Sequence, residues 1–533
     1  MVGSMKKGVL SARAYHWGTS HIRNKIPPHY LDFDKYPLPF KSYEFFGETK
    51  LSTDFPNHDL DLFELLCKKT TQASMDLINL SHVLFLSYGV TFRKETGSIP
   101  FLLRTVPSAG GLYPCHLYVG INHVDGLGTG VYYFDPIQGR LGRIRNHTRY
   151  HPEDSGLDAK HFSDGRPSVF FIVTASFYTS AWKYRQRAFR YMLLDSGHLL
   201  ENLDLALDLY GVNHSIFYDF KDDYVSTLLG LDPALEVPLA WVSTYGDKSV
   251  SDSGRKAKNH KERDKGKIAL SVKDKTKPVR YEVLEQIHAA GIPIVPERSL
   301  PESKVIDKPS IKTVVLSRKT IQKNQDQGFK NSVIYRRSRR NFIPGKIHTR
   351  DWSALFDRIF CNLFPDPLFS TPETRGKHDF TQKTLDQAAK VKKFLSLGMI
   401  CQNLQDLDDG FYIFPRDFSQ LELMAEGRFA PKLANVCLDQ EWIKAAGINF
   451  LFMANLKELE KAFGPRGYRY IMFNAGRIAQ RIYLAAHDLG FGCCGIGALY
   501  DEEAKSLLEL NEDSALLYGV AAGPVKKMVR HGT

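Results

Sequence analysis

Two short stretches of this sequence combine residue types that could bind a ligand. The first, IYRRSRRNF, places Arg336, Arg337, Ser338 and Arg340 within five positions. A guanidinium group matches a phosphate through two parallel hydrogen bonds and keeps its charge at any useful pH, so this cluster is a candidate anion cradle. Taken alone, the same cluster is also typical of a charged surface turn.

The second stretch, RTVPSAGGLYP, covers residues 104–114 and has few groups for acid–base work. It offers backbone N–H groups instead, because Ala109 and Gly110 allow a ligand to approach the chain closely. Pro107 restricts the backbone at the entry to the loop, and Ser108 adds one hydroxyl donor. We refer to these four residues as the PSAG loop.

Lys183 and Tyr184 are the best candidates for proton transfer. They precede a long apolar segment, in SAWKYRQRAFRY. A lysine whose pKa is lowered by burial or by nearby cations can act as a general base, although a Lys-Tyr pair at a helix start is more often surface packing. We interpret His198 as a hydrogen-bonded core histidine rather than a catalytic one, and the neighbours Cys493 and Cys494 as packing residues.

Two long apolar segments repeat each other. RYMLLDSGHLLENLDLALDLYG covers residues 190–211, RYIMFNAGRIAQRIYLAAHDLG covers 469–490, and identical residues recur at a constant offset of 279. Each segment is apolar enough all round for a buried helix and ends on a glycine suited to a left-handed cap. Each also has a glycine in its middle, Gly197 or Gly476, which costs about 1 kcal/mol unless another element packs closely against it.

The elements around these segments follow one order in both halves. We expect strands over 115–121, 130–141 and 169–177 in the first half and over 410–423 and 448–456 in the second. Helices mixed with strands that are joined by short returns predict an α+β fold with a central, mostly antiparallel sheet and helices around it. The predicted organisation is an N-terminal extension (1–60), a first domain (61–246), a basic flexible linker (247–310) and a second domain (311–533).

Composition and charge narrow the class of protein. Eleven Lys and Arg stand against five Asp and Glu between Asp247 and Lys277, which accounts for half of the net charge of +12. That stretch lacks periodicity, so we interpret it as a solvated linker, with a basic arm for an acidic partner as the less favoured alternative, and expect no nucleic-acid binding.

No run reaches the ~20 apolar residues of a membrane span, and the opening residues lack the apolar core of a signal peptide. The seven cysteines include no CxxC pair. We therefore expect a cytoplasmic protein without a metal site or a disulfide framework.

The first half resembles the SagB/ThcOx-type dehydrogenases, a branch of the FMN-dependent nitroreductase superfamily. The resemblance is carried, in order, by YHWGTS, RTVPSAGGLYP, GVYYFDP, KYRQRAFRYMLLDSGHLLENL and LGLDPALEVPL, and residues 330–527 match more loosely. In that family each FMN lies at a homodimer interface, and the two subunits donate different parts. The resemblance therefore implies tandem nitroreductase-like domains that form an intramolecular pseudo-dimer, for which a monomer is sufficient.

The parts that this family uses to hold FMN are divided unevenly between the halves. The arginine-rich cradle and a glycine turn, Gly495, Ile496 and Gly497 in LGFGCCGIGAL, occur in the second half, whereas the PSAG loop occurs in the first. In place of the cradle the first half has KKTTQ at residues 68–72. We expect one FMN site that is composite between the halves, and a second site that has decayed.

In azole-forming members of this family, a Lys-Tyr pair at the position of Lys183 and Tyr184 takes part in proton removal. At the 279 offset the second half has Ala462 and Phe463. The resemblance implies an FMN-dependent oxidoreductase that dehydrogenates thiazoline or oxazoline rings to azoles in a peptide-derived natural product, with dioxygen as the final acceptor. The implied substrate is a modified peptide or small molecule, and a cyclodehydratase partner is compatible with this chemistry.

Two alternatives remain open. An NAD(P)H-dependent reductase of nitro or quinone compounds would share the fold and FMN. A non-catalytic peptide-binding scaffold would have lost flavin from both sites. The N-terminal extension, rich in Tyr, Pro and Phe, is expected to wrap the first domain or to guide a peptide substrate.

Overall fold

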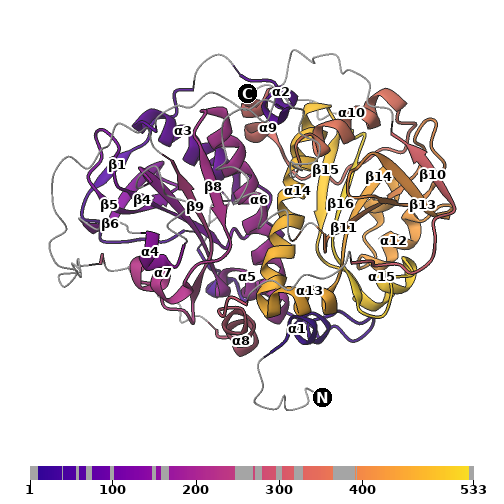
Figure 1. Cartoon of the computed structure of the whole chain (residues 1–533), viewed down its shortest axis with the longest axis horizontal. Helices are drawn as coiled ribbons and strands as arrows, with labels where there is room; N and C mark the ends of the chain where they lie inside the picture. Colours follow the sequence, from indigo (N-terminus) through magenta and orange to yellow (C-terminus); the bar gives the residue numbers. More distant parts are fainter. Residues whose placement is uncertain are drawn as a thin grey trace.

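Two similar halves lie side by side in this protein, with two long helices between their sheets (Figure 1). The computed structural model describes residues 10–38, 40–55, 59–67, 75–95, 101–146, 152–157, 167–245, 268–269, 279–295, 303–316, 328–363, 391 and 393–526. The first half was expected to have KKTTQ, at residues 68–72, in place of the cradle, and this segment lies outside the described residues.

The first half contains a seven-stranded antiparallel sheet in the order β1-β6-β5-β4-β7-β9-β8. Its central strands are apolar on both faces because helices and loops cover both sides. The strands are β1 (Glu48–Lys50), β4 (Cys115–Ile121), β5 (Gly130–Asp135), β6 (Arg140–Asn146), β7 (Val169–Ser176), β8 (His214–Phe217) and β9 (Glu236–Thr244). A separate hairpin, β2 (Val90–Lys94) and β3 (Phe101–Arg104), leads into the PSAG loop.

The second half repeats this sheet in the order β10-β13-β12-β11-β14-β16-β15, also antiparallel. Every strand occupies the place of its counterpart in the first sheet. The strands are β10 (Lys312–Val315), β11 (Ser396–Cys401), β12 (Gly410–Phe414), β13 (Gln420–Glu426), β14 (Ile448–Asn455), β15 (Gly492–Ile496) and β16 (Ser514–Gly523). The predicted tandem α+β fold is therefore confirmed.

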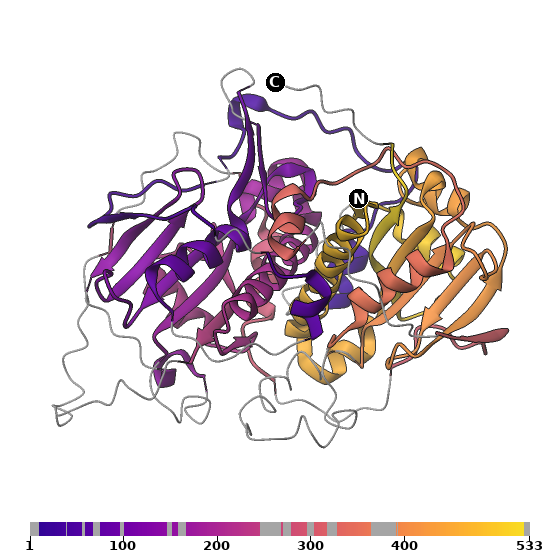
Figure 2. The same ribbon diagram turned by 90° about the horizontal axis from the view of Figure 1, so that it is seen from above.

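The helices also recur in pairs. The long helices α6 (Ala188–Leu209) and α14 (Gly467–Asp488) pack against each other between the sheets, as the view from above shows (Figure 2). The other helices are α1 (Ala12–Gly18), α2 (Leu62–Cys67), α3 (Leu77–Tyr88), α4 (Pro152–Ser155), α5 (Phe177–Tyr184), α7 (Asp222–Leu229), α8 (Glu282–Ala290), α9 (Phe329–Tyr335), α10 (Thr349–Phe360), α12 (Ala430–Val436), α13 (Leu456–Phe463) and α15 (Asp501–Leu507).

The mid-helix glycines meet where α6 and α14 cross. A Cβ atom at Gly197 would lie 2.4 Å from the backbone oxygen of Phe473 and 2.9 Å from the Cα atom of Gly476. A Cβ atom at Gly476 would lie 2.4 Å from the backbone oxygen of Leu194. Each glycine therefore allows the other helix to approach closely. The close packing that was expected to offset the cost of a mid-helix glycine is provided by the opposite long helix.

Buried ion pairs link the halves reciprocally, beginning with two arginines of the first half. Arg187 Nη1 donates to Asp501 Oδ2 at 2.7 Å, and Arg190 Nη1 donates to Asp501 Oδ1 at 2.6 Å. Asp501 begins α15 of the second half. His16 of α1 lies 3.5 Å from the same carboxylate.

An equivalent cluster pairs two arginines of the second half with an aspartate of the first. Arg466 Nη1 and Arg469 Nη1 each donate to one oxygen of Asp222 at 2.7 Å, and Asp222 begins α7 of the first half. His288 of α8 lies 3.8 Å from this carboxylate. The sequence separation between Asp222 and Asp501 equals the repeat offset of 279, so both clusters occupy equivalent positions.

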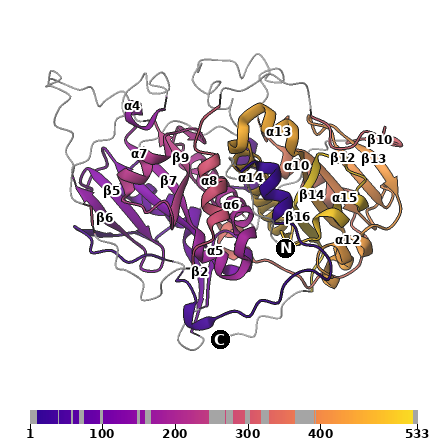
Figure 3. The same ribbon diagram turned by 90° about the horizontal axis from the view of Figure 1, so that it is seen from below.

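The segment predicted as a flexible linker over 247–310 contains a helix. α8 lies within it, with Leu284, Ile287 and His288 buried, and Arg466 donates to the backbone oxygen of Gly291 at 2.8 Å. Seen from below, α1 lies beside the second half, and α8 occupies a matching place beside the first (Figure 3). The helix was not predicted because its amphipathic sequence, EVLEQIHAA, is short and follows directly on the charged stretch.

Three further observations bear on the class of protein. Cys361 is disulfide-bonded, which the sequence analysis did not predict, whereas Cys115, Cys401, Cys437, Cys493 and Cys494 are free. Among the described helices, none combines the length and the apolar composition that crossing a membrane requires. Within the same part of the chain, no three His, Cys, Asp or Glu side chains lie close enough together to hold a metal ion.

Candidate functional site

The PSAG loop connects β3 to β4 and contains a 3-10 turn, Ala109–Gly111. Gly110 has φ of +65°, a conformation that favours glycine. A Cβ atom at Gly110 would lie 2.8 Å from the hydroxyl oxygen of Tyr184 and 3.3 Å from Lys183 Nζ. Only backbone fits where the loop meets the Lys-Tyr pair, so the two predicted elements lie in contact.

Asp195 of α6 holds the PSAG loop through two hydrogen bonds. Ser108 Oγ donates to Asp195 Oδ2 at 2.5 Å, and the Ala109 N–H donates to Asp195 Oδ1 at 3.2 Å. The backbone N–H of Tyr113 donates to Ser108 Oγ at 2.9 Å. Asp195 was not among the residues predicted from the sequence, although a carboxylate inside the apolar run RYMLLDSGHLL could have indicated it.

The cradle lies beside the glycine turn. Ser338 forms a parallel bridge with Cys493, and the Arg339 N–H donates to the Cys493 backbone oxygen at 2.8 Å. The hydroxyl of Tyr483, on α14, lies 3.0 Å from Ser338 Oγ and accepts from the Gly495 N–H at 2.6 Å. Tyr483 therefore holds these two segments of the second half together.

Tyrosine side chains press against the glycines of this turn. A Cβ atom at Gly495 would lie 2.0 Å from the hydroxyl oxygen of Tyr518, which belongs to β16. A Cβ atom at Gly497 would lie 2.5 Å from Tyr191, which comes from α6 of the other half. A larger residue at either position would collide with an aromatic ring.

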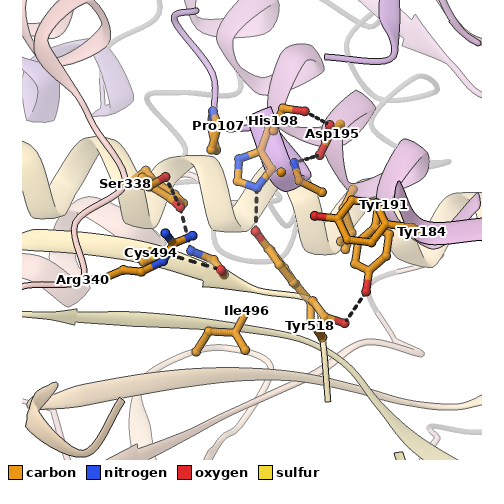
Figure 4. Close-up of a pocket in the computed structure, with 18 of the residues that line it drawn as sticks. Pro107, Tyr184, Tyr191, Asp195, His198, Ser338, Arg340, Cys494, Ile496 and Tyr518 are labelled. Atoms are coloured by element: carbon orange, nitrogen blue, oxygen red, sulfur yellow. Dashed lines mark hydrogen bonds between the residues drawn. The ribbon is translucent and has the colours of Figure 1, made fainter. Parts of the chain in front are cut away.

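These segments surround one pocket of about 700 Å³, its open mouth included, and Figure 4 shows its lining. The first half supplies the predicted residues Pro107, Ser108, Ala109, Gly110 and Tyr184, and the second half supplies Ser338, Arg340, Gly495, Ile496 and Gly497. Residues that the sequence analysis did not propose complete the lining: Tyr191, Leu194, Asp195, His198, Gln440, Tyr483, Cys494, Ala498 and Tyr518. Ser108 and Arg340 thus face one cavity despite their distance in the sequence.

The structure does not bring Arg336 to the pocket lining. Its side chain is buried, and Nε and Nη2 donate to the backbone oxygens of Thr105 at 3.1 Å and Arg104 at 3.0 Å. Its guanidinium carbon lies 5.3 Å from the ring centroid of Tyr483. Arg336 therefore braces the chain that leads into the PSAG loop from across the interface.

Arg337 and Lys183 also lie outside the lining. Arg337 Nη1 donates to the backbone oxygen of Ile334 at 2.9 Å, and its Nη2 donates to that of Thr91 at 3.3 Å. Lys183 is exposed at the end of α5. Burial raises the pKa of its neighbour Tyr184, which keeps that phenol protonated.

His198 is held in a network that crosses the interface. Gln480 Nε2 donates to Asn202 Oδ1 at 2.7 Å, which leaves Gln480 Oε1 to accept from His198 Nδ1 at 2.8 Å. His198 Nε2 can then accept from the hydroxyl of Tyr518 at 3.2 Å. Burial lowers the pKa of His198 to about 3, so the imidazole is neutral and structural, although it also lines the pocket.

Comparison with known proteins identifies relatives of the whole fold. A profile of the nitroreductase family matches residues 85–246 and 415–523, together just over half of the chain. Over 188 residues the chain is 32% identical to MJ1384 of Methanocaldococcus jannaschii, which is described as a nitroreductase, and this match covers 35% of the chain and 87% of that protein. A crystal structure of an Anabaena variabilis protein described as a nitroreductase superposes with a TM-score of 0.72 at 24% identity over 97% of this chain and 99% of that one, which shows a shared fold.

Two further relatives are named for the processing of microcin B17 and of trifolitoxin. The chain is 28% identical to the microcin B17-processing protein McbC of Escherichia coli over 27% of its length, and 31% identical to the trifolitoxin-processing protein TfxB of Rhizobium leguminosarum over 37%. The matched segments span 54% and 52% of those proteins, about half of each.

Proposed function

Because the chain belongs to the nitroreductase family, we propose that it binds FMN and dehydrogenates thiazoline or oxazoline rings in a modified peptide. The observation that carries this proposal is a pocket lined jointly by the PSAG loop of one half and by Ser338, Arg340 and the glycine turn of the other. The names of the relatives McbC and TfxB support a peptide as substrate. A cyclodehydratase would form the rings that this reaction consumes.

The residues of the pocket fit FMN in two respects. Gly110, Gly495 and Gly497 line the pocket with backbone alone, and tyrosine side chains pack against each of them, so uncharged backbone and aromatic rings are the surfaces offered to a planar ring. Arg340, whose side chain is accessible, offers a guanidinium group to a phosphate or to the pyrimidine edge of a flavin. Arg340 and Ser338 would hold the phosphate end, and the PSAG loop and the glycine turn would cover the ring.

Bound FMN supplies a two-electron acceptor. Conversion of an azoline to an azole removes a hydride and a proton from neighbouring ring atoms, so the protein must hold the ring in place and accept the proton. We assign proton removal to the amine of Lys183, which lies next to Gly110 and is open to solvent, so it can release its own proton to water before it accepts one from the ring. Tyr184 stays protonated and donates a hydrogen bond that orients the substrate. Dioxygen would be the final acceptor of the two electrons.

The test uses the full-length protein reconstituted with FMN and a peptide that carries one thiazoline ring, in air and without NADPH. We expect flavin absorbance to persist through gel filtration and the peptide to lose the mass of two hydrogen atoms. Lys183→Met should retain FMN and reduce turnover by roughly 100-fold or more, within the range of general-base effects. Lys461→Met, on the equivalent helix α13, is the matched control and should keep wild-type turnover.

A reductase of nitro or quinone compounds is the second candidate, favoured by the description of MJ1384 as a nitroreductase. It predicts that NADPH bleaches the bound flavin and that azoline peptides are not oxidised. A protein that retains no flavin at all would instead be a peptide-binding scaffold. Either result would overturn the dehydrogenase assignment.

A further inference from the structure

Asp195 is the unusual residue of the pocket. Of the described residues that line it, Asp195 alone has a carboxyl group, and the residue is only 6% exposed. Its oxygens accept hydrogen bonds from Ser108 and Ala109, which are neutral donors. Burial of an ionised carboxylate that accepts only from neutral donors is costly, so the ionised form of this group does not stabilise the fold.

The other half of the molecule has no such group. Asn474 occupies the equivalent position of α14, and its Nδ2 donates to the backbone oxygen of Tyr470 at 3.0 Å. An amide is therefore compatible with this position of the helix. The carboxyl occurs only in the half that carries the PSAG loop, which points to a role in the pocket rather than in the fold.

We propose that Asp195 is a positioning residue that stores one proton beneath the PSAG loop and thereby sets whether Ser108 offers a bound ligand a donor or an acceptor. When Asp195 is ionised, the Ser108 O–H donates to it, and the Ser108 oxygen accepts from the Tyr113 N–H. Only a lone pair of the hydroxyl is then left for a ligand.

Uptake of one proton from solvent reverses this arrangement. The new O–H of Asp195 donates to Ser108 Oγ, which still accepts from the Tyr113 N–H and is then saturated as an acceptor. The Ser108 O–H is thereby released to donate to the ligand. Only the O–H bond of the carboxyl group is made, and no electron is transferred.

The surroundings of Asp195 favour the protonated form near neutral pH. The titratable groups that face it are neutral, because burial raises the pKa of each: Tyr88 of α3, Tyr113, Cys115 of β4, Tyr184 of α5 and Tyr518 of β16. Two cations lie nearby: Arg104, over the Tyr88 ring at 4.2 Å, and Arg340, in the pocket lining. Burial raises the pKa of Asp195 to about 7, against the lowering by its hydrogen bonds from Ser108 and Ala109.

The first experiment needs no cofactor. Infrared difference spectra of the flavin-free protein, wild type minus Asp195→Asn, should show the C=O band of a protonated carboxylic acid that titrates with a midpoint near pH 7. Ser108→Ala removes a hydrogen bond that stabilises the ionised form, so it should move the midpoint to higher pH. Absence of a titrating carboxyl between about pH 6 and pH 8 would overturn the proposal.

Asp208→Asn is the matched control. Asp208 also lies on α6, and burial raises its pKa to about 6, but it lies outside the pocket lining. The Asp195 band should persist in this variant. Circular dichroism spectra should be the same for all three variants, and a band that disappears in Asp208→Asn would show that it had been assigned to the wrong residue, which also counts against the proposal.

The second experiment rests on the proposed function, because it measures FMN binding. The edge of an oxidised flavin ring consists mostly of acceptors, so a donating Ser108 should bind it better. FMN should bind about fivefold more tightly at pH 6 than at pH 8, the value of one neutral hydrogen bond. Asp195→Asn should bind tightly at both pH values, and Ser108→Ala weakly at both.

The two experiments fail separately. Loss of all FMN binding would refute the proposed function while the infrared titration still reports on Asp195. Wild-type pH dependence of FMN affinity in Asp195→Asn would refute the control of Ser108 by Asp195.

Discussion

The arginines of the cradle differ in what they contact, because one lines the pocket and another binds protein backbone. Arg340 lines the pocket with an accessible side chain, whereas Arg336 is buried and donates to backbone oxygens of residues 104 and 105 in the other half. Four neighbouring arginines thus have different surroundings because successive side chains of an extended segment point in different directions. Only the arginine that faces the cavity is expected to contribute directly to ligand affinity.

Arg340→Ala should therefore weaken FMN binding by roughly 10- to 100-fold, the cost of losing a charged hydrogen-bonding partner. Fluorescence titration of FMN into the flavin-free protein measures this change. Arg339→Ala is the control, because Arg339 lies outside the pocket lining and donates to the Lys526 backbone oxygen at 3.5 Å. Equal losses in the two variants would show that general positive charge, rather than contact, governs binding.

At the scale of elements, the crossing of α6 and α14 sets the distance between the two parts of the site. α6 carries Tyr191 and Asp195 below the PSAG loop, and α14 carries Tyr483 beside the cradle. The Gly197 and Gly476 contact lets the helix backbones touch. The width of the pocket therefore depends on two residues that line no part of it.

Gly197→Ala should separate these helices, because its Cβ atom would lie 2.4 Å from a backbone oxygen that cannot rotate away. We expect a loss of about 2 kcal/mol in the free energy of unfolding, together with weaker FMN binding. Urea denaturation and FMN titration test both effects. Gly345→Ala is the control, since no atom lies within 4 Å of its added Cβ, and it should change neither quantity.

At the scale of the whole molecule, each half completes the other. Arginines of one half pair with an aspartate of the other in two equivalent clusters, and α1 and α8 each add a buried histidine. Because removal of one partner from a buried cluster leaves an uncompensated charge, the halves are expected to unfold together. The composite pocket lies in the same interface, so loss of this interface removes the site as well.

These histidines make the interface sensitive to acid. Burial, followed by the charge of Arg469, lowers the pKa of His288 to about 3, although Asp222 raises it. The unfolded chain binds a proton to this histidine below about pH 6.5 and the folded chain does not, so stability falls as the pH drops from 6.5 toward 3.

Between pH 7.5 and pH 5, the wild type should therefore lose about 2 kcal/mol more unfolding free energy than His288→Asn does. Urea denaturation at both pH values measures the difference. Replacement of the exposed His123 by Asn should leave the wild-type pH dependence unchanged. A His288→Asn variant with the same pH dependence as the wild type would contradict this account.

The local pattern of residues determined the elements and their repetition. The apolar helices, the antiparallel strands and the order of elements follow from periodicity, glycine positions and the 279-residue offset, and the tandem fold predicted from them is confirmed. The candidate site residues were also chosen from residue types within short segments, namely small residues in the PSAG loop, arginines in the cradle and glycines in the turn. Their roles toward FMN stay predictions.

Only the tertiary structure decided how those residues face one another. It placed Arg340 in the pocket and Arg336 behind it, exposed Lys183, put Asp195 beneath Ser108 and turned part of the expected linker into α8. Sequence patterns report on residues a few positions apart, because the hydrogen bonds of helices and turns are local. The burial of a side chain and the direction in which it points depend instead on segments hundreds of residues away, and here on the opposite half of the same chain.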